Sequence, residues 1–450
     1  MKMSPFQLVI IGLFGLAALG AVGVLSGVIK LPQSANENLS GSVTMWGTID
    51  AKAFQFTENF LQSQNKNISF KYVQKPQANF ESVLSEAIAS GRGPDLILIS
   101  QEQILRNKSK LVIQKLDADT TLAYKNAYIN GAELFLTEEG LTALPFGVNP
   151  LVMYYNDRLL TSAGFSKPPQ YWDEMETYVD ALTVKNDNKD IRQSAIALGT
   201  FENLEYPLDI VSALILQTGN KIVEGKTTYD NTDNARTTYQ SYLATNTSNQ
   251  VVEFFNAFSN PQKKLYSWNK SLPDDLNAFT SELTTFWFGY PTDEARIEAK
   301  NQNLNYKVTS IPQIRNSKNR LTYGKIYGIG ILKSSPNKSA ASFIAQELTR
   351  NEAQKVTLED GGLQYPYRTT PTGTTKNDVS ALFARQAIQV VGYYMPSFDF
   401  TYALFNSTLS QIASGAIDTD RGVQRIEAEL NNYISKNQLK KNEKNSRNIL

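Results

Sequence analysis

The run Leu96–Ile99 is unbroken aliphatic sequence, and it limits the kinds of sheet into which this chain can fold. Strands buried on both faces show such continuous runs, and they are typical of parallel sheets covered by helices. Residues 79–90 before it place their apolar side chains on one helical stripe. Gly91 stands where a left-handed helix cap is expected, and Pro94 prevents further helix. The sequence therefore predicts a helix, a turn and a central strand.

The segment before this helix alternates between strand and helix patterns. Residues 42–46 and 68–73 have the composition of strands, and an amphipathic run around Phe54, Phe60 and Leu61 lies between them. Alternation of this kind predicts an α/β fold with a parallel sheet layer. A chain of 450 residues is long enough for two or three domains.

The glycine-rich turn at Gly91 and Gly93 does not have the order of a phosphate-binding loop. Such loops run from a strand into a helix, whereas this turn runs from a helix into a strand. Open α/β sheets instead bind ligands at the carboxyl ends of their strands. Polar and aromatic residues follow two strands there: Glu102 lies within residues 100–103, and Trp46 and Asp50 lie at the end of the first strand. Asp50 is equally suited to capping the next helix.

The N-terminal segment predicts a membrane anchor. Residues 6–29 carry no charge, and as a helix they would span about 36 Å, enough for a hydrocarbon core of ~30 Å. A long cleaved signal peptide is the alternative. We assign residues 1–30 to a transmembrane anchor, 31–40 to a polar linker, 41–435 to the folded body and 436–450 to a flexible tail.

The composition excludes several kinds of chemistry. The chain has no cysteine and no histidine, so disulfides, thiol nucleophiles, Ser-His-Asp triads and zinc sites built on these residues are impossible. A net charge of +1 gives no electrostatic reason to expect nucleic acid. The loop 185–190 lacks the turn glycine and the terminal glutamate of a calcium loop. We expect no cofactor, no metal and no nucleic acid partner.

Four segments, in order, resemble the extracellular solute-binding proteins of ABC importers, in their maltose-binding-protein-like group. The segments are ASGRGPDLILIS (89–100), ALPFGVNPLVMYYNDRLLTSAGFSKPPQYWDEMETYVDAL (143–182), ILKSSPNKSAASFIAQELT (331–349) and YPYRTTP (365–371). The second also has a local interpretation: Trp172 can pack where a helix begins, and Asp173 can cap that helix. Together the segments span most of the folded body.

The resemblance implies a two-lobed, type II periplasmic-binding-protein-like α/β fold, with chain crossings near 147–150 and 310–312. Lobe one would comprise 41–148 and 311–355, and lobe two 149–310 and 356–435. The implied function is capture of an oligosaccharide, or a related polar solute, in a cleft between the lobes and its delivery to an ABC permease. We expect a monomer whose body lies on the extracytoplasmic side of the cell membrane, where the anchor confines it near that permease.

Sugar sites combine flat aromatic platforms with side chains that pair with hydroxyls. The resemblance and this chemistry together give ten candidate ligand-binding residues: Trp46, Asp50, Glu102, Asn149, Tyr206, Asp209, Tyr290, Tyr327, Phe398 and Asp399. Two positions depart from patterns seen in some relatives. Ile99 stands in place of an aromatic residue and Asn149 in place of an acid, so the identity of the sugar stays open.

Two other functional classes remain open. A glycoside hydrolase needs only two carboxylates about 5–9.5 Å apart, and 43 acidic residues supply many pairs. A surface-binding protein without a role in transport would keep the same fold. Serine chemistry is disfavoured, because the S-x-x-K patterns at Ser267 and Ser335 lack the K-T-G and S-D-N elements that accompany it.

Overall fold

The computed structural model describes residues 39–229, 235–317, 319–371, 373 and 376–447. The expected anchor and nearly all of the expected linker lie outside these residues. Within the described part, no helix combines the length and the apolar character that crossing a membrane requires.

The chain forms two compact units, and each is assembled from separate segments. Unit 1 contains the described residues up to Ser100, then Asn107–Val148 and Ile326–Thr374. Unit 2 contains Gln101–Arg106, Asn149–Lys325 and the chain from Thr375 onward. The lobe boundaries expected from the sequence stay a prediction.

Unit 1 is built on a sheet with the strand order β2–β1–β3–β14. Strands β1 and β2 pair in parallel, as do β1 and β3, whereas β14 runs antiparallel to β3. Two strands, β6 and β14, continue from one unit into the other. The strands are β1 (Gly41–Gly47), β2 (Ile68–Gln74), β3 (Leu96–Ser100), β4 (Leu136–Thr137), β5 (Gly140–Leu141), β6 (Leu144–Pro150) and β14 (Thr322–Ile331).

The helices of unit 1 cover this sheet and bury its core. They are α2 (Lys52–Gln64), α3 (Phe80–Ala89), α5 (Ala118–Ala127), α12 (Lys338–Leu348) and α13 (Asn351–Asp360). Strand β3 is buried along its whole length, and helix α3 buries Phe80 and Leu84. Gly91 has a φ of 70°, a left-handed conformation that glycine adopts without a steric cost. The predicted helix, turn and central strand are confirmed.

Unit 2 contains a second sheet with the order β13–β7–β12–β9–β8. A separate hairpin pairs β10 with β11, and β15 pairs with the first residues of β14. The strands are β7 (Val152–Asn156), β8 (Val184–Lys185), β9 (Ile191–Ile196), β10 (Val223–Tyr229), β11 (Ala235–Ser241), β12 (Thr284–Gly289), β13 (Tyr306–Thr309) and β15 (Val390–Val391).

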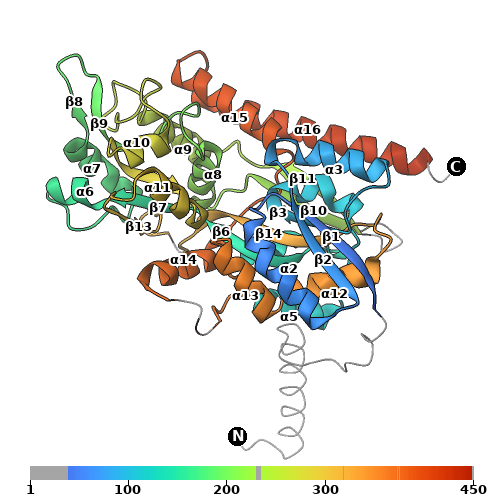
Figure 1. Cartoon of the computed structure of the whole chain (residues 1–450). Helices are drawn as coiled ribbons and strands as arrows, with labels where there is room; N and C mark the ends of the chain where they lie inside the picture. The colour runs from blue at the N-terminus through green and yellow to red at the C-terminus, as the bar shows by residue number, and fades with distance from the viewer. Residues whose placement is uncertain (1–38, 230–234, 318, 372, 374–375, 448–450) are drawn as a thin grey trace, which may run out of the picture. The chain divides into compact units, whose positions relative to one another are not determined.

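Helix α8 is the central helix of unit 2, because nearly all of its side chains are buried in one large apolar core. The helices are α4 (Ile104–Asn107), α6 (Asp157–Ser162), α7 (Met175–Leu182), α8 (Pro207–Gln217), α9 (Asn246–Ala257), α10 (Asp275–Thr280), α11 (Glu294–Lys300), α14 (Asp378–Ile388), α15 (Phe398–Ala413) and α16 (Thr419–Arg447). Helices α15 and α16 pack side by side (Figure 1).

The C-terminal segment is helical where its composition predicts a flexible tail. Helix α16 includes residues 436–447 of the expected tail at 436–450. Residues 436–447 include four lysines and one each of Leu, Gln, Glu and Arg, all of which have high helix propensity, and the low apolar content of the segment does not reveal this.

The segment before α7 confirms one local expectation and corrects another. Trp172 is buried, and its Nε1 donates a hydrogen bond to Gln217 Oε1 at 2.7 Å. Asp173 does not cap the helix, because its carboxylate accepts hydrogen bonds from Arg315. Glu174 takes the role at the helix start, where its Oε2 accepts from the Gln170 amide at 2.8 Å.

Candidate functional site

A largely buried lysine lies at the centre of the candidate site in unit 2. Lys325 Nζ, on β14, lies 3.0 and 3.1 Å from the two carboxylate oxygens of Glu102 and 3.5 Å from Asp209 Oδ2. The Lys325 side chain is 13% exposed, and each carboxylate side chain is 4% exposed. Lysine is rarely buried unless it is paired, and here it has two acidic partners. We call Glu102, Asp209, Tyr290, Tyr323 and Lys325 the Lys325 cluster.

The ends of secondary structure elements position the two acids. Glu102 lies in a single 3₁₀ turn directly after β3, and Asp209 lies in the first turn of α8, after Pro207. The amino terminus of a helix attracts negative charge, so the Asp209 position suits a carboxylate. Glu102 thus lies at the strand end that the sequence predicts, and Asp209, which the family resemblance implied, lies at the start of a helix that begins with proline.

Two buried tyrosines hold the carboxylates in place. Tyr323 Oη donates to Glu102 Oε1 at 2.7 Å, and Tyr290 Oη donates to Asp209 Oδ2 at 2.7 Å. Burial raises the pKa of both tyrosines well above the usual value, so both remain protonated donors. Burial also raises the pKa of Asp209, while the positive charge of Lys325 opposes that rise.

A second group of polar contacts adjoins Tyr290, at the 3₁₀ turn Pro291–Asp293. Tyr206 Oη lies 3.0 Å from Asp293 Oδ1, and Asp293 Oδ2 accepts from the Tyr290 amide at 2.8 Å. Asn149 Nδ2 donates to Thr292 Oγ1 at 2.9 Å. Asn149 Oδ1 is buried and has no hydrogen-bond partner among the described residues.

Aromatic rings lie beside the charged groups. Phe398 begins α15, and the Lys325 ammonium lies 5.5 Å from the centroid of its ring. Tyr206 packs edge to face against Tyr290, with ring centroids 4.9 Å apart. Tyr290 is fully buried, whereas Phe398 and Tyr206 are half-buried. Of these three rings, only Phe398 and Tyr206 are partly exposed.

The structure brings together six of the ten sequence candidates in unit 2: Glu102, Asn149, Tyr206, Asp209, Tyr290 and Phe398. Asp399 is also in unit 2 but is exposed in the first turn of α15.

The other three candidates, Trp46, Asp50 and Tyr327, belong to unit 1. Lys75 Nζ lies 3.9 Å from the centre of the Trp46 ring. Asp50 Oδ1 accepts from the Lys52 amide at 2.9 Å, although Ala51, and not Asp50, stands at the N-cap position of α2. Tyr327 is half-buried on β14, opposite Ser100.

Three members of the site, Lys325, Tyr323 and Asp293, are not among the ten candidates predicted from the sequence. Lys325 had a recognisable signal, because it is the only charged residue in the segment Thr322–Ile331, which otherwise reads as a buried strand. A lone lysine in such a strand needs an acidic partner. Among the described residues, no group of three or more acidic side chains is arranged to hold a metal ion.

Two compact α/β units, with aromatic and polar groups gathered in unit 2 at the ends of strands and helices, have the architecture of a ligand-binding protein. The chain belongs to the family of bacterial extracellular solute-binding proteins, whose sequence pattern matches residues 53–379. The resemblance seen in the four sequence segments is thereby confirmed.

Solved structures show the same two-lobed periplasmic-binding-protein-like fold. The GacH receptor of Streptomyces glaucescens, solved unliganded and with acarbose, has a TM-score of 0.69 and 15% identity, covering 88% of this chain and 99% of that one. The sugar-binding protein MalE of Xanthomonas citri has a TM-score of 0.67 and 17% identity, with coverages of 89% and 98%.

A curated relative matches over part of its length. The maltotriose-binding protein of Pyrococcus abyssi is 24% identical over 154 residues, which are 33% of this chain and 32% of that protein. The match thus spans about a third of that relative.

Proposed function

We propose that this protein binds an uncharged oligosaccharide and delivers it to an ABC permease. Membership of the extracellular solute-binding family supports a binding role. The names of similar proteins support the ligand class, since one binds maltotriose, one was solved with acarbose and one is a sugar-binding protein. The observation that carries the proposal is the placing of two half-buried rings, Phe398 and Tyr206, beside the buried polar Lys325 cluster.

Each part of this arrangement has a role in sugar recognition. The faces of Phe398 and Tyr206 stack on the C–H faces of pyranose rings. Asn149 Oδ1 accepts a hydrogen bond from a hydroxyl group, which satisfies its unpaired oxygen. The Lys325 cluster fixes these groups in place, because four of its five members are buried and all five are joined by hydrogen bonds and ion pairs. Trp46, Asp50, Tyr327 and Asp399 remain proposed contributors from the sequence resemblance.

We infer that the site binds its ligand without hydrolysing it. A glycosidase needs one protonated carboxyl group and one free carboxylate that both face the sugar. Here Lys325 lies against both Glu102 and Asp209, and Tyr290 donates to Asp209. These contacts engage both oxygens of Glu102 and the Oδ2 atom of Asp209, so neither carboxyl group faces a glycosidic bond unpaired. Prolonged incubation with maltotriose should therefore yield no glucose or maltose in a chromatographic assay, and product formation would favour the hydrolase.

Maltotriose binding to the full chain tests the proposed ligand class. A ligand that binds only the folded state stabilises it by about 2.7 kcal/mol at a hundredfold excess over its dissociation constant. We expect maltotriose to raise the midpoint of thermal unfolding in a concentration-dependent way. If maltotriose and other oligosaccharides all leave the midpoint unchanged, sugar binding is contradicted. The contradiction is clearest if a peptide or a polyamine raises the midpoint.

A matched pair of variants tests the site. Phe398→Ala removes a proposed stacking face and should weaken maltotriose binding roughly five- to tenfold, because aromatic stacking of this kind is worth about 1–1.5 kcal/mol. Phe56→Ala removes a ring that is 62% exposed on α2 and should leave the affinity unchanged. Equal affinities in the two variants would show that the sugar binds elsewhere.

We further propose that residues 1–30, with the uncharged run at 6–29, remain attached as the membrane anchor and hold the body on the extracytoplasmic side of the cell membrane. The length of this uncharged run and the extracellular family support the proposal. The protein should stay with membranes after an alkaline carbonate wash. Release of a shortened protein, with a new amino terminus after residue 20, would instead indicate a cleaved signal peptide.

A further inference from the structure

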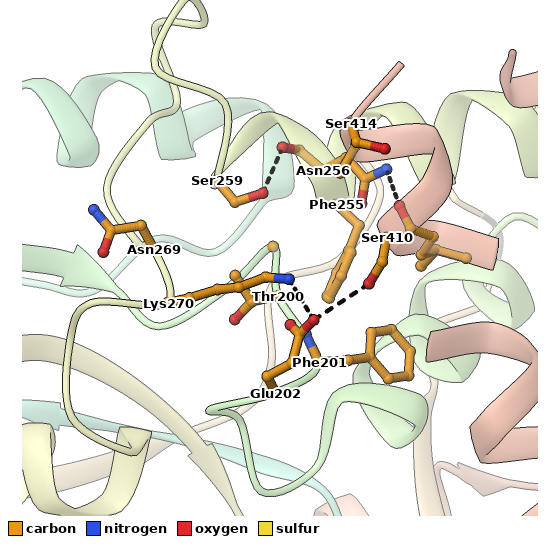
Figure 2. A pocket seen from close by; sticks show the side chains of 13 residues that line it. Thr200, Phe201, Glu202, Phe255, Asn256, Ser259, Asn269, Lys270, Ser410 and Ser414 are labelled. Atoms are coloured by element: carbon orange, nitrogen blue, oxygen red, sulfur yellow. Dashed lines mark hydrogen bonds and ion pairs between the residues drawn. The ribbon is translucent and has the colours of Figure 1, made fainter. Parts of the chain in front are cut away.

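Unit 2 contains a pocket of about 240 Å³ that belongs to none of the contacts described so far. Four segments line it: the turn after β9, the end of α9, the loop at 269–270 and the end of α15 (Figure 2). Ser410 in this pocket and Phe398 in the sugar site lie on the same helix, twelve residues or roughly 18 Å apart. The pocket is therefore separate from the Lys325 cluster.

An ion pair forms one wall of the pocket. Lys270 Nζ donates to Glu202 Oε1, and Ser410 Oγ donates to the same oxygen at 3.4 Å (Figure 2). Burial alone would raise the pKa of Glu202, but the hydrogen bonds from Lys270 and from backbone amides outweigh it and hold the pKa below its usual value. The wall thus presents one carboxylate and one ammonium whose charges cancel.

Uncharged polar groups surround this ion pair. Asn256 and Ser259 come from α9 and the residues after it, and Asn269 and Ser414 complete the rim. Asn256 is only 8% exposed, and its Nδ2 donates to the Leu409 carbonyl at 3.4 Å. Hydroxyl and amide groups of this kind both donate and accept hydrogen bonds, so they suit a ligand that carries several hydroxyls.

The floor of the pocket is apolar and rigidly packed. The rings of Phe201 and Phe255 meet edge to face with centroids 5.9 Å apart, and both are buried. Gly199 has a φ of 102°, and a Cβ at this position would lie 2.7 Å from the Ser259 amide nitrogen and 2.9 Å from the Phe255 carbonyl oxygen. The backbone segments therefore approach as closely as a glycine allows, and the floor is preformed.

We propose that this pocket binds a single neutral pyranose ring, as a second carbohydrate site independent of the oligosaccharide site. The volume lies below the roughly 300–1,000 Å³ of pockets for drug-sized ligands, so the occupant is small. The polar wall and rim pair with ring hydroxyls, and the apolar floor contacts the C–H groups. The charges of Lys270 and Glu202 cancel, so the wall offers no net attraction to a cation or an anion, and this favours a neutral ligand.

A fluorescent label at the rim can test this proposal, because the native chain has no cysteine to label in competition. The full chain carrying Ser414→Cys, with a small environment-sensitive dye, is titrated with D-glucose, glucosamine, gluconate and glycine betaine. Ser281→Cys, exposed at the end of α10, carries the same dye as a control. D-glucose should alter emission only at position 414, with a dissociation constant of about millimolar order, as expected for so small a ligand.

Two further variants separate this pocket from the oligosaccharide site. Glu202→Gln keeps the size of the side chain and removes its charge, and it should weaken the D-glucose response at least about tenfold. Phe398→Ala should leave the response intact, even if it abolishes maltotriose binding. An unchanged thermal midpoint for Glu202→Gln verifies that the variant folds.

Three results would overturn the proposal. The first is no response to D-glucose at position 414 in the folded chain. The second is a response that Phe398→Ala abolishes and Glu202→Gln spares, because it would come from the other site. The third is a response to glycine betaine or a charged sugar as strong as that to D-glucose, which would assign the pocket to a zwitterion or an ion.

Discussion

The ammonium group of Lys325 separates two buried carboxylates, and its removal should destabilise the protein in a pH-dependent way. Lys325→Met keeps the length of the side chain and removes the charge. Glu102 and Asp209 then remain buried without their shared cation, and they keep the hydroxyl groups of Tyr323 and Tyr290 as hydrogen-bond donors. Two carboxylates that share a site cannot both ionise without cost.

The distances give the size of the effect. At an effective dielectric constant of about 20, a charge pair at 3.0 Å is worth about 5.5 kcal/mol and one at 3.5 Å about 4.7 kcal/mol. Most of this energy offsets the cost of burying the ammonium group, and loss of one partner from a buried pair typically costs about 3–5 kcal/mol. We therefore expect Lys325→Met to lower the free energy of unfolding by about 4 kcal/mol at pH 8.

The pH dependence identifies the cause of the loss. Without Lys325, the folded-state pKa of one carboxyl group rises further, so its stabilising contribution is present at low pH and is lost as the pH rises through that pKa. Urea unfolding at pH 5 and pH 8 should thus show the larger loss at pH 8. A loss below about 1 kcal/mol, or one that is equal at both pH values, would refute the reasoning.

A second substitution and a control complete this experiment. Adding Glu102→Gln to Lys325→Met removes the nearer carboxylate charge, while the new amide oxygen can still accept from Tyr323, so the double variant should recover at least half of the lost stability. Lys307 forms an ion pair with Asp157 at 2.9 Å, but its side chain is 57% exposed. Lys307→Met should have little effect, because water already screens exposed pairs.

Two further predictions concern backbone and buried charge elsewhere in unit 2. Burial raises the pKa of Asp275 from 3.8 to about 7, so the stability that its protonated form contributes is lost as the pH rises from about 4 to 7. In urea unfolding, the free energy of unfolding of Asp275→Asn should therefore rise by about 4 kcal/mol relative to that of the parent over this pH range. A difference between the two proteins that does not change with pH would contradict the raised pKa. Gly199→Ala should lower the free energy of unfolding by about 3 kcal/mol, because the added Cβ overlaps its neighbours and the backbone is strained. Gly164 has a φ of 87° and no atom within 4 Å of a Cβ built there, so Gly164→Ala should lower it by only about 1 kcal/mol. Equal losses would show that the neighbours of Gly199 move aside for the Cβ.

Local patterns in the sequence were sufficient to predict the fold around the central strand of unit 1. The aliphatic run at 96–99, the stripe at Phe80 and Leu84 and the glycine at 91 each act over a few residues, and the structure has the strand, the helix and the left-handed turn. The helix at 436–447 could not be predicted in this way, because its composition is low in apolar residues and only its helix propensity favours order.

The partners within the site could not be predicted from local patterns. The sequence places Glu102 at a strand end, but its partner Lys325 lies 223 residues further along the chain. A single chain without related sequences carries no signal for a pair so distant. The prediction for Asp173 was wrong for the same reason. The local pattern makes its carboxylate a helix cap, but the carboxylate instead accepts from Arg315, which lies 142 residues away.

The sequence candidates are of two kinds: buried side chains that hold the site together, and partly exposed side chains that a ligand can contact. Tyr290 is 2% exposed and bonded to Asp209, so Tyr290→Phe should lower stability and alter binding together. Phe398 is half-buried and begins a helix, so its ring can be removed with less effect on the core. Loss of affinity therefore indicates a direct contact with the ligand only when the substituted side chain is partly exposed, as Phe398 is. A variant at Tyr290, Asp209 or Glu102 that binds more weakly indicates a direct contact only if its stability is also shown to be unchanged.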